Sequence, residues 1–374
     1  MKVLVAPDKF KGSLTATAAA NAIARGWTQA LAGDEVDLAP IADGGEGFAE
    51  ALASAMDGAW ITVPAHDPLG RPIHARYAWM ESARLAAIEM SEASGLWRLH
   101  PSEYAPLRAN TYGTGELIRD AAARGAQTIL VGLGGSATTD GGAGMAAALG
   151  FRFLTTDGET LEPVPENLLA LIRIDRSAAI ELPKVIAACD VQNPLLGSRG
   201  TAHVFAPQKG ADERTVAHLE YALQSLADLI TEQFEVDHRE RAGAGAAGGL
   251  GFGLLFFANA EIRNGFEVVS EAMQLGARIR AADLVITGEG CLDGQTLEGK
   301  GPAGVAALVR AQDKPVLAFA GVIVDNSGVD ALFDAVFSIV DQPVSKEEAM
   351  RHAAQYLERA ARRAARGIAL GRRI

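Results

Sequence analysis

Short apolar runs that alternate with helical patterns at both ends of the chain constrain the fold most. Near the N-terminus, "KVLVA" (2–6) precedes a helical pattern over 13–27, and "ADLVITG" (282–288) precedes another over 302–311. A short apolar run fits a buried strand. A strand followed by a helix leads through a right-handed crossover to a parallel neighbour. The two ends of the chain therefore predict an α/β unit with a parallel sheet.

The middle of the chain has a different pattern. Residues 59–80 hold two alternating segments around "DPLG", which predicts a β-hairpin. Further strands are expected at 84–91, 126–135 and 183–191, and helices at 113–124, 141–149 and 212–235. Because a hairpin is joined here to strand–helix units, we expect mixed strand directions.

The length of the chain predicts two domains, because 374 residues exceed what one core usually organises. We predict an α/β protein in which residues 1–70 and 280–374 form a Rossmann-like parallel-sheet domain. A second, mixed α/β domain is inserted at 71–279. A last amphipathic helix is expected from 345 to 366.

Composition excludes several classes of protein. The net charge is −12, and an acidic chain is a poor ligand for nucleic acid, which binds by neutralisation of its phosphates. The two cysteines, Cys189 and Cys291, form no CxxC or Cys/His cluster, so neither zinc nor a disulfide framework is expected. This cysteine usage suits a reducing, cytoplasmic location. The apolar run at the N-terminus is too short for a signal peptide.

One uncharged window tests a membrane location. Residues 242–260 carry no charge over 19 positions, a length that permits a spanning helix. Six of these positions are Gly and six are Ala, so the window is only weakly apolar. We expect a Gly-rich turn that leads into a buried helix, and no membrane partner.

Glycine clusters follow predicted strands rather than falling at random. They occupy 42–47, 132–142, 245–253 and 288–301. In open α/β sheets, ligands bind just past the carboxyl ends of strands, where glycines let backbone N–H groups approach an anion. The clusters therefore predict a site of several parts for a phosphorylated ligand. The alternative is that the glycines only form turns.

The cluster "VGLGGSATTDGGAG" (131–144) is the strongest candidate for a phosphate cradle. Gly134, Gly135 and Ser136 offer backbone N–H groups and a hydroxyl as donors for a phosphate or a nucleotide. Asp140 follows them and either caps the next helix or coordinates a metal.

Two further loops carry polar residues at predicted strand ends. After the first strand come Lys11, whose compact charge suits phosphoryl oxygens, and Ser13, which we expect to cap the first helix and to bind phosphate. After the second strand, Asp43 and Glu46 lie three residues apart. Carboxylates in such a turn suit Mg²⁺. The alternatives are a solvated loop for Lys11 and helix capping for the carboxylates.

Asp190 lies near the end of the segment 183–191, directly after its apolar residues, and Asn193 comes three residues later. A carboxylate at the mouth of a buried strand suits the acceptance of a proton from an alcohol, as phosphoryl transfer requires. The alternative is an Asx-type turn.

The segment "GQTLEGKG" (294–301) lacks one residue of a P-loop, because Gly301 stands where Ser or Thr is required. We therefore expect a phosphate-contacting loop of another kind. Its polar members are Asp293, Thr296 and Lys300.

Eight motifs then occur in a recognisable order: "APDKFKGSL", "PIADGGEG", "NTYGTGEL", "GLGGSATTDGGAGM", "CDVQNPLLG", "PQKGA", "AAGGLGFGL" and "DLVITGEGCLDGQTLEGKGPAGVA". Together they resemble bacterial glycerate kinase of the first class, the glycerate 2-kinase type. The resemblance implies ATP- and Mg²⁺-dependent phosphorylation of D-glycerate to 2-phosphoglycerate. It also implies a Rossmann- or flavodoxin-like domain plus a second α/β domain, with the active site in the cleft between them.

Four positions depart from the pattern that the resemblance implies. Lys9 stands in place of Ser, Phe48 in place of Thr and Thr139 in place of an amide. Cys291 stands where Arg is expected. Loss of a guanidinium beside a phosphate removes a contact worth on the order of 1.5–3 kcal/mol.

The resulting hypothesis is transfer of the γ-phosphoryl group of Mg-ATP to a glycerate hydroxyl. Asp190 orients or deprotonates that hydroxyl, Lys11 and Lys300 neutralise phosphoryl oxygens, and Asp43 binds Mg²⁺. The substrate carboxylate pairs with Arg199 or Arg71, and Asn193 and Asp293 are further substrate-binding candidates.

Three alternatives to this hypothesis stay open. They are phosphorylation of another small hydroxy acid, phosphorylation of the 3-position of glycerate, and a non-catalytic sensor of a phosphorylated metabolite. A homodimer is one assembly open to the chain.

Overall fold

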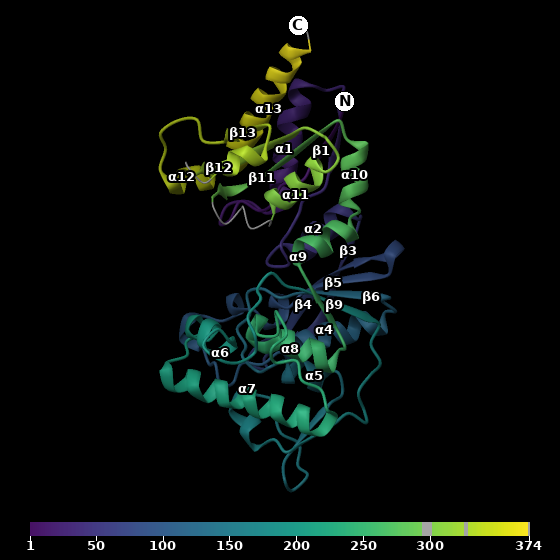
Figure 1. The fold of residues 1–374 in the computed structure, drawn as a ribbon, viewed down its shortest axis with the longest axis vertical. Coiled ribbons are helices and arrows are strands. Elements are labelled where there is room, and N and C mark those ends of the chain that lie inside the picture. Colours follow the sequence, from purple (N-terminus) through teal and green to yellow (C-terminus); the bar gives the residue numbers. More distant parts are fainter. Residues whose placement is uncertain (294–300, 325–327, 373–374) are drawn as a thin grey trace. The chain divides into compact units, whose positions relative to one another are not determined.

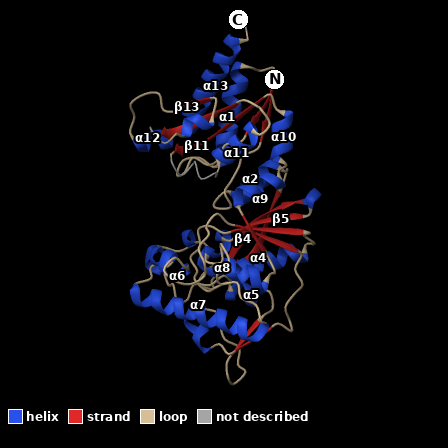
Figure 2. Cartoon of the chain, in the orientation of Figure 1, coloured by secondary structure: helices blue, strands red, loops and turns tan. Residues whose placement is uncertain are grey.

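The computed structural model describes residues 1–293, 301–324 and 328–372 (Figure 1). The chain divides into two compact units. The first unit consists of Met1–Asp43, Glu50–Asp57 and Phe266–Ile374, and the second unit consists of Gly44–Ala49 and Gly58–Gly265. Each unit has a sheet of its own (Figure 2).

The first unit is built on a five-stranded sheet of order β13-β12-β11-β1-β2. Its strands are β1 (Lys2–Val5), β2 (Glu35–Leu38), β11 (Leu284–Leu292), β12 (Val316–Ile323) and β13 (Ala335–Ser338). Every neighbouring pair is parallel, and β1 lies between β2 and β11. The prediction that the two ends of the chain share a parallel sheet is therefore confirmed.

The helices of the first unit pack against this sheet and against one another. They are α1 (Ala16–Ala30), α10 (Leu275–Ala281), α11 (Pro302–Arg310), α12 (Lys346–Arg351) and α13 (Ala353–Gly371), together with most of α2 (Phe48–Ala55) and α9 (Gly265–Ala272). Helices α1 and α13 approach closely, because a Cβ atom at Gly26 would lie 2.0 Å from the Glu358 carbonyl oxygen. Fully buried Trp27 and Leu357 belong to the same core.

The expectation that Ser13 caps the first helix is wrong. The N-cap of α1 is Thr15, whose hydroxyl accepts from the Ala18 N–H at 3.2 Å. Residues 10–14 form a tight turn before the helix, and in this turn the Ser13 hydroxyl donates to the Phe10 carbonyl at 2.9 Å. The turn moves the N-cap two residues beyond Ser13, and the helix begins at Ala16.

The second unit has a six-stranded sheet of order β10-β9-β6-β5-β4-β3. The strands are β3 (Ala59–His66), β4 (Pro72–Met80), β5 (Leu85–Glu89), β6 (Thr128–Gly132), β9 (Lys184–Ala188) and β10 (Glu261–Arg263). Strands β3, β4 and β5 pair antiparallel, whereas β5, β6, β9 and β10 pair parallel. The hairpin at 59–80 and the mixed strand directions are both confirmed. A small ribbon, β7 (Arg152–Leu154) with β8 (Arg173–Asp175), completes the unit.

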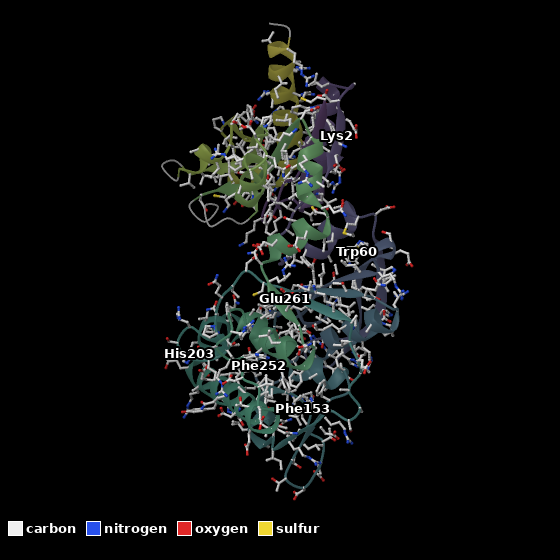
Figure 3. The ribbon with its side chains drawn as sticks, turned by 45° about the vertical axis from the view of Figure 1, so that its right-hand side comes forward. Lys2, Trp60, Phe153, His203, Phe252 and Glu261 are labelled. Carbon is white, nitrogen blue, oxygen red and sulfur yellow. The ribbon has the colours of Figure 1, made fainter. Side chains whose placement is uncertain are left out.

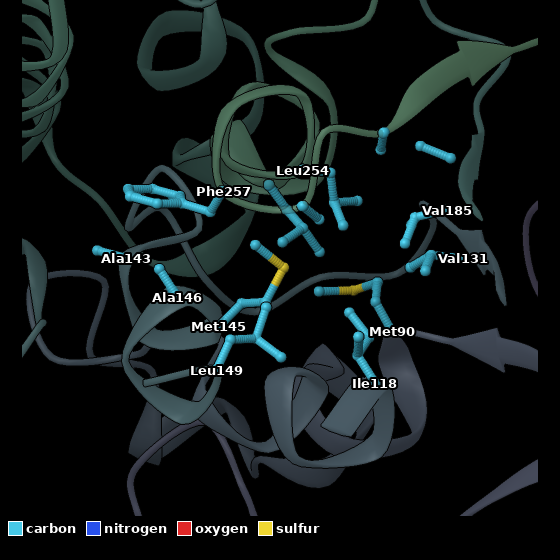
Figure 4. Close-up of a cluster of buried hydrophobic side chains, with 14 of the residues drawn as sticks. Met90, Ile118, Val131, Ala143, Met145, Ala146, Leu149, Val185, Leu254 and Phe257 are labelled. Carbon is cyan, nitrogen blue, oxygen red and sulfur yellow. The ribbon is translucent and has the colours of Figure 1, made fainter. Parts of the chain in front are cut away.

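Helices enclose the core of the second unit. They are α3 (Ser91–Ser94), α4 (Tyr112–Ala123), α5 (Ala143–Ala148), α6 (Thr201–Phe205), α7 (Glu213–Phe234) and α8 (Ala246–Phe257). Figure 4 shows Ile118 of α4, Met145 of α5 and Leu254 of α8 gathered against Val131 of β6. Phe153 and Phe252 lie inside the unit, whereas His203 is exposed (Figure 3). The central strands have apolar runs because helices cover them.

The Gly-rich window at 242–260 forms a turn followed by a buried helix, as expected. Ala247, Gly248 and Gly249 at the start of α8 have positive φ angles, and regular helix follows. Among the described residues, no helix is long and apolar enough to cross a bilayer.

Gly248→Ala should unfold the second unit more readily, by more than about 3 kcal/mol. Gly248 has φ +75°, and a Cβ atom there would lie 1.8 Å from the Thr138 carbonyl oxygen, so both the backbone and the packing would be strained. Urea unfolding would measure the change. The matched control is Gly33→Ala, because nothing lies within 4 Å of its added Cβ. It should stay within about 1 kcal/mol of the wild type. Equal stability of the two variants would contradict this account.

Candidate active site

Acidic residues follow three strands of the first unit at the carboxyl edge of its sheet. Asp8 follows β1, Asp43 follows β2 and Asp293 follows β11. The Asp8 N–H donates to the Gly288 carbonyl at 2.8 Å, which fixes the loop beside β11. The Lys9 ammonium lies 3.4 Å from Oδ1 of Asp43. Because parallel strands end at the same edge, the sheet gathers carboxylates from separate parts of the sequence.

This edge suits Mg²⁺ in the chemistry of its donors. Mg²⁺ prefers oxygen ligands and is usually held by one or two carboxylates together with substrate phosphates and water. Asp43 is 36% exposed, so its carboxylate is accessible, and Asp8 faces the start of α11. Within the described ranges, no three His, Cys, Asp or Glu side chains form a metal-binding group. A site completed by phosphate oxygens does not need such a group.

Lys11 and Ser13 lie in the turn that precedes α1. Lys11 is exposed, and Ser13 is half-buried with its hydroxyl donated to Phe10. The predicted residues Thr296 and Lys300 lie outside the described residues. Asp293 is described and is half-buried.

Cys291 lies in β11 with an exposed side chain. Its thiol lies 3.8 Å from Oδ2 of Asp293. Partial burial raises the pKa of the Cys291 thiol, and the negative charges of Asp293 and Glu289 raise it further. The position where the resemblance implies Arg therefore carries a neutral thiol between carboxylates.

In the second unit, four parallel strands end at a common edge. Strands β5, β6, β9 and β10 end at Glu89, Gly132, Ala188 and Arg263. The segments that follow contain the predicted cradle after β6 and Asp190 after β9. This edge therefore holds the predicted proton acceptor and the groups that are predicted to donate hydrogen bonds to a phosphate.

The glycines of the cradle have conformational reasons to be glycine. Gly135 has φ +66°, and a Cβ atom at Gly134 would lie 2.9 Å from the Cα of Gly45. The hydrogen bonds of this loop use the Gly135 carbonyl, which accepts from Leu96, and the Ala137 N–H, which donates to Ser94. In the part of the chain that the structure describes, none uses the N–H groups of Gly134, Gly135 or Ser136. Three consecutive amides are therefore available to an anion.

Glu89 fastens the "GGEG" turn to the end of β5. Its Oε1 accepts from the Ala49 N–H at 2.9 Å, and Gly47 contributes a second backbone hydrogen bond. Burial raises the pKa of Glu89, and these two hydrogen bonds oppose the rise. The sequence analysis missed Glu89, because its partners are about forty residues away along the chain.

Lys209 is the second residue that the sequence analysis missed. It is only 1% exposed, and its Nζ donates to the Ser136 hydroxyl at 2.8 Å and to the Thr138 carbonyl at 2.6 Å. Burial lowers the pKa of Lys209 to about 7, and the nearby negative charge of Asp140 opposes the shift. Only the motif "PQKGA" drew attention to this position in the sequence.

Asp140 accepts hydrogen bonds at the starts of α4 and α5, which favours the capping alternative. It is fully buried, and its carboxylate accepts from the N–H and hydroxyl of Thr111 and from the N–H groups of Gly142 and Gly144. Burial raises the pKa of Asp140, and these hydrogen bonds oppose the rise. The carboxylate thus joins the starts of α4 and α5. Thr139 beside it is fully buried, and its hydroxyl has no hydrogen-bond partner among the described residues.

Asp190 is half-buried and held in a fixed orientation. Its Oδ1 accepts from Nδ2 of Asn264 at 2.7 Å and from the Gly265 N–H at 3.1 Å, both of which follow β10. The side chain of Asn193 donates to the Arg199 carbonyl at 2.7 Å and so shapes the loop that presents the exposed Arg199. The hydrogen bonds from Asn264 and Gly265 fix the direction of the Asp190 carboxylate.

Arg71 lies in a different environment from Arg199. Its guanidinium donates to Asp67 at 2.5 Å and to Glu103 at 2.6 Å. These hydrogen bonds raise the pKa of Arg71. Two carboxylates already hold this guanidinium, so Arg199 is the more available partner for an anionic substrate.

The fold and the loops define a two-unit α/β protein. At the carboxyl ends of its parallel strands lie acidic loops and a Gly-rich loop suited to bind phosphate. A model described as the glycerate kinase family matches residues 3–369. A glycerate kinase of Halalkalibacterium halodurans is 42% identical over 356 residues, which cover 93% of each chain. The glycerate 2-kinase of Escherichia coli K12 is 40% identical and covers 100% of this chain and 99% of its own.

A solved structure supports the same assignment. The crystal structure of a Salmonella typhimurium LT2 protein described as a glycerate kinase 2 superposes with a TM-score of 0.91 at 40% identity, with full coverage of both chains. The chain therefore belongs to the glycerate kinase family.

The burial of Lys209 predicts a pH-dependent term in stability. Its pKa is about 7 in the fold against an ordinary value of 10.5, so between these values the unfolded chain binds more protons. The free energy of unfolding should therefore rise with pH in this window, by at most about 1.4 kcal/mol per pH unit. Urea unfolding of the wild type and of Lys209→Met at several pH values measures the difference between them.

The matched control for this experiment is Lys184→Met, which removes an exposed lysine at the amino end of β9. Its stability should follow the wild type at every pH. A constant difference between the wild type and Lys209→Met from neutral to alkaline pH would contradict the buried-lysine account.

Proposed function

We propose that this chain transfers the γ-phosphoryl group of ATP to the 2-hydroxyl group of D-glycerate and releases ADP and 2-phosphoglycerate. Membership of the glycerate kinase family supports the reaction class, and the name of the E. coli relative, glycerate 2-kinase, supports the 2-position. The observation that carries the proposal is the shared edge of the second sheet. There the oriented carboxylate of Asp190 and the unused amides of Gly134–Ser136 follow parallel strands of one sheet.

Asp190 has the properties that the acceptor step needs. Its Oδ1 is fixed by Asn264 and by a backbone N–H, so the carboxylate has a defined direction. We assign it to orient the glycerate hydroxyl and to accept its proton as the new P–O bond forms. The proton leaves the hydroxyl oxygen, the hydroxyl attacks the γ-phosphorus, and the bond to the β-phosphate oxygen breaks.

The negative charges of the phosphoryl groups are assigned to residues of the loops. We assign phosphoryl oxygens to the cradle of Gly134, Gly135 and Ser136, and in the first unit to Lys11 and Ser13, with Lys300 and Thr296 as further contacts. Asp43 would hold Mg²⁺, which when bound supplies positive charge to the phosphates.

The substrate carboxylate needs a cation. We assign it first to Arg199, because this side chain is exposed on a loop that Asn193 shapes. Arg71 is second, because Asp67 and Glu103 already bind its guanidinium. Asp293 is a further substrate-binding candidate, through hydrogen bonds from hydroxyl groups.

A second candidate function follows from Cys291. A thiol beside Asp293 stands where the resemblance implies Arg, so the second candidate substrate is a hydroxy acid that differs in charge from glycerate. A panel of small hydroxy acids in the same assay separates this candidate from D-glycerate.

Asp190→Asn should lose at least about 100-fold in turnover, because an amide does not accept the hydroxyl proton. Binding of ATP should stay close to wild type, since the substitution keeps the shape of the side chain. A coupled assay of ADP release with D-glycerate and Mg-ATP measures turnover, and calorimetry measures nucleotide binding.

The control for this variant is Asp157→Asn, which alters an exposed carboxylate in a turn. It should turn over at the wild-type rate. Wild-type turnover by Asp190→Asn would refute the role of Asp190. If the folded wild-type protein releases no ADP in response to D-glycerate, the proposed function itself is wrong.

A further inference from the structure

Lys209 is buried where a lysine is rarely found. Fully buried lysines are uncommon unless they are paired, yet the two acceptors of the Lys209 amino group are neutral oxygens, the Ser136 hydroxyl and the Thr138 carbonyl. Both belong to the cradle loop, and they lie 73 and 71 residues away along the chain. The charged group that acts on Lys209 within the described residues is Asp140. The buried amino group of Lys209 is therefore in direct contact with the cradle loop.

The hydrogen bond from Lys209 determines what the Ser136 hydroxyl has left to offer. A hydroxyl has one donor proton and two lone pairs. Because a lone pair of Ser136 accepts from Lys209, its proton points elsewhere and stays available as a donor. The N–H groups of Gly134, Gly135 and Ser136 are unused within the described residues. The Ser136 O–H, polarised by Lys209, is therefore a fourth hydrogen-bond donor beside the three amide N–H groups.

We propose that Lys209 is a positioning residue that acts through Ser136, orienting this hydroxyl toward a bound phosphoryl group, and that Lys209 takes up a proton from solvent when that group binds. The inference deepens the proposed function, on which it rests. The proton enters on the Lys209 nitrogen, and no other bond changes. The negative charge of the phosphoryl group stabilises the ammonium form, as an opposite charge does for any buried base.

The alternative is that Lys209 only holds the loop in place. The hydrogen bonds to Ser136 and Thr138 would serve that purpose as well. A merely structural lysine would also take up a proton beside a bound phosphoryl group, but loss of the Ser136 hydroxyl would then leave the affinity for that group close to wild type. The Ser136→Ala variant therefore separates the two roles.

The test is calorimetry at about pH 8 in two buffers of different ionisation enthalpy. The probes are Mg-ATP and 2-phosphoglycerate, which present the phosphoryl group of the donor and of the product. We expect the wild type to take up as much as roughly one proton with the probe that occupies the cradle. Lys209→Met should bind that probe at least about tenfold more weakly, with no proton uptake.

Two variants of Ser136 keep the test valid if Lys209→Met does not fold. Ser136→Ala removes the relayed hydroxyl and should weaken binding of the same probe and reduce proton uptake. Ser136→Thr restores a hydroxyl and should recover both. The control is Lys184→Met, which lies at the amino end of β9, away from the carboxyl edge. Its affinity and proton uptake should match those of the wild type.

Several outcomes would overturn the inference. They are the absence of proton uptake by the wild type with both probes, unchanged uptake in Lys209→Met, and wild-type affinity and uptake in Ser136→Ala. The ADP-release assay with D-glycerate is measured on the same wild-type protein. Proton-linked binding without glycerate turnover would reject the proposed substrate but keep the role of Lys209 at a phosphoryl site. Glycerate turnover without proton uptake would keep the proposed function and reject the role of Lys209.

Discussion

The second unit depends on the close approach of backbone segments at the carboxyl edge of its sheet. A Cβ atom at Gly248 would lie 1.8 Å from the Thr138 carbonyl, one at Gly134 would lie 2.9 Å from Gly45, and one at Gly44 would lie 3.0 Å from the Ala188 carbonyl. Segments that are distant in sequence thus meet backbone to backbone, with no side chain between them. This packing brings the cradle, the "GGEG" turn and the end of β9 together. A glycine in these loops is therefore a packing requirement as well as an opening for an anion.

Buried charge is the second constraint on the same edge. Asp140 satisfies the starts of α4 and α5, and Lys209 holds the loop that precedes α5. Each of these ionisable groups costs free energy to bury, and hydrogen bonds compensate each of them. Within the described ranges, the amides of Gly134 to Ser136 stay unused, on the part of the loop that includes the exposed Gly135. The loop is thus ordered before any ligand arrives, which reduces the entropy lost on binding.

Periodicity in the sequence predicted the regular elements well, because apolar spacing reports directly which face of a segment is buried. The parallel sheet of the first unit, the hairpin at 59–80 and helices α4 and α7 follow this rule. Side-chain partners were not predictable in the same way. Ser13 looked like a helix cap, but the turn at 10–14 moved the cap to Thr15. Arg71 was a candidate partner for the substrate carboxylate, and the structure shows Asp67 and Glu103 bound to its guanidinium.

The sequence by itself determined the α/β class, the order of the loops along the chain and the resemblance to the glycerate kinase family, since these depend on local patterns and short motifs. The tertiary structure alone decided which of the polar residues meet. Lys209 reaches Ser136 across 73 residues, and Glu89 reaches Ala49 across 40. No local pattern encodes such pairs, because they arise from the packing of segments that are distant in sequence. The physical reason is that a parallel sheet gathers its strand ends at one edge, whatever their distance in sequence.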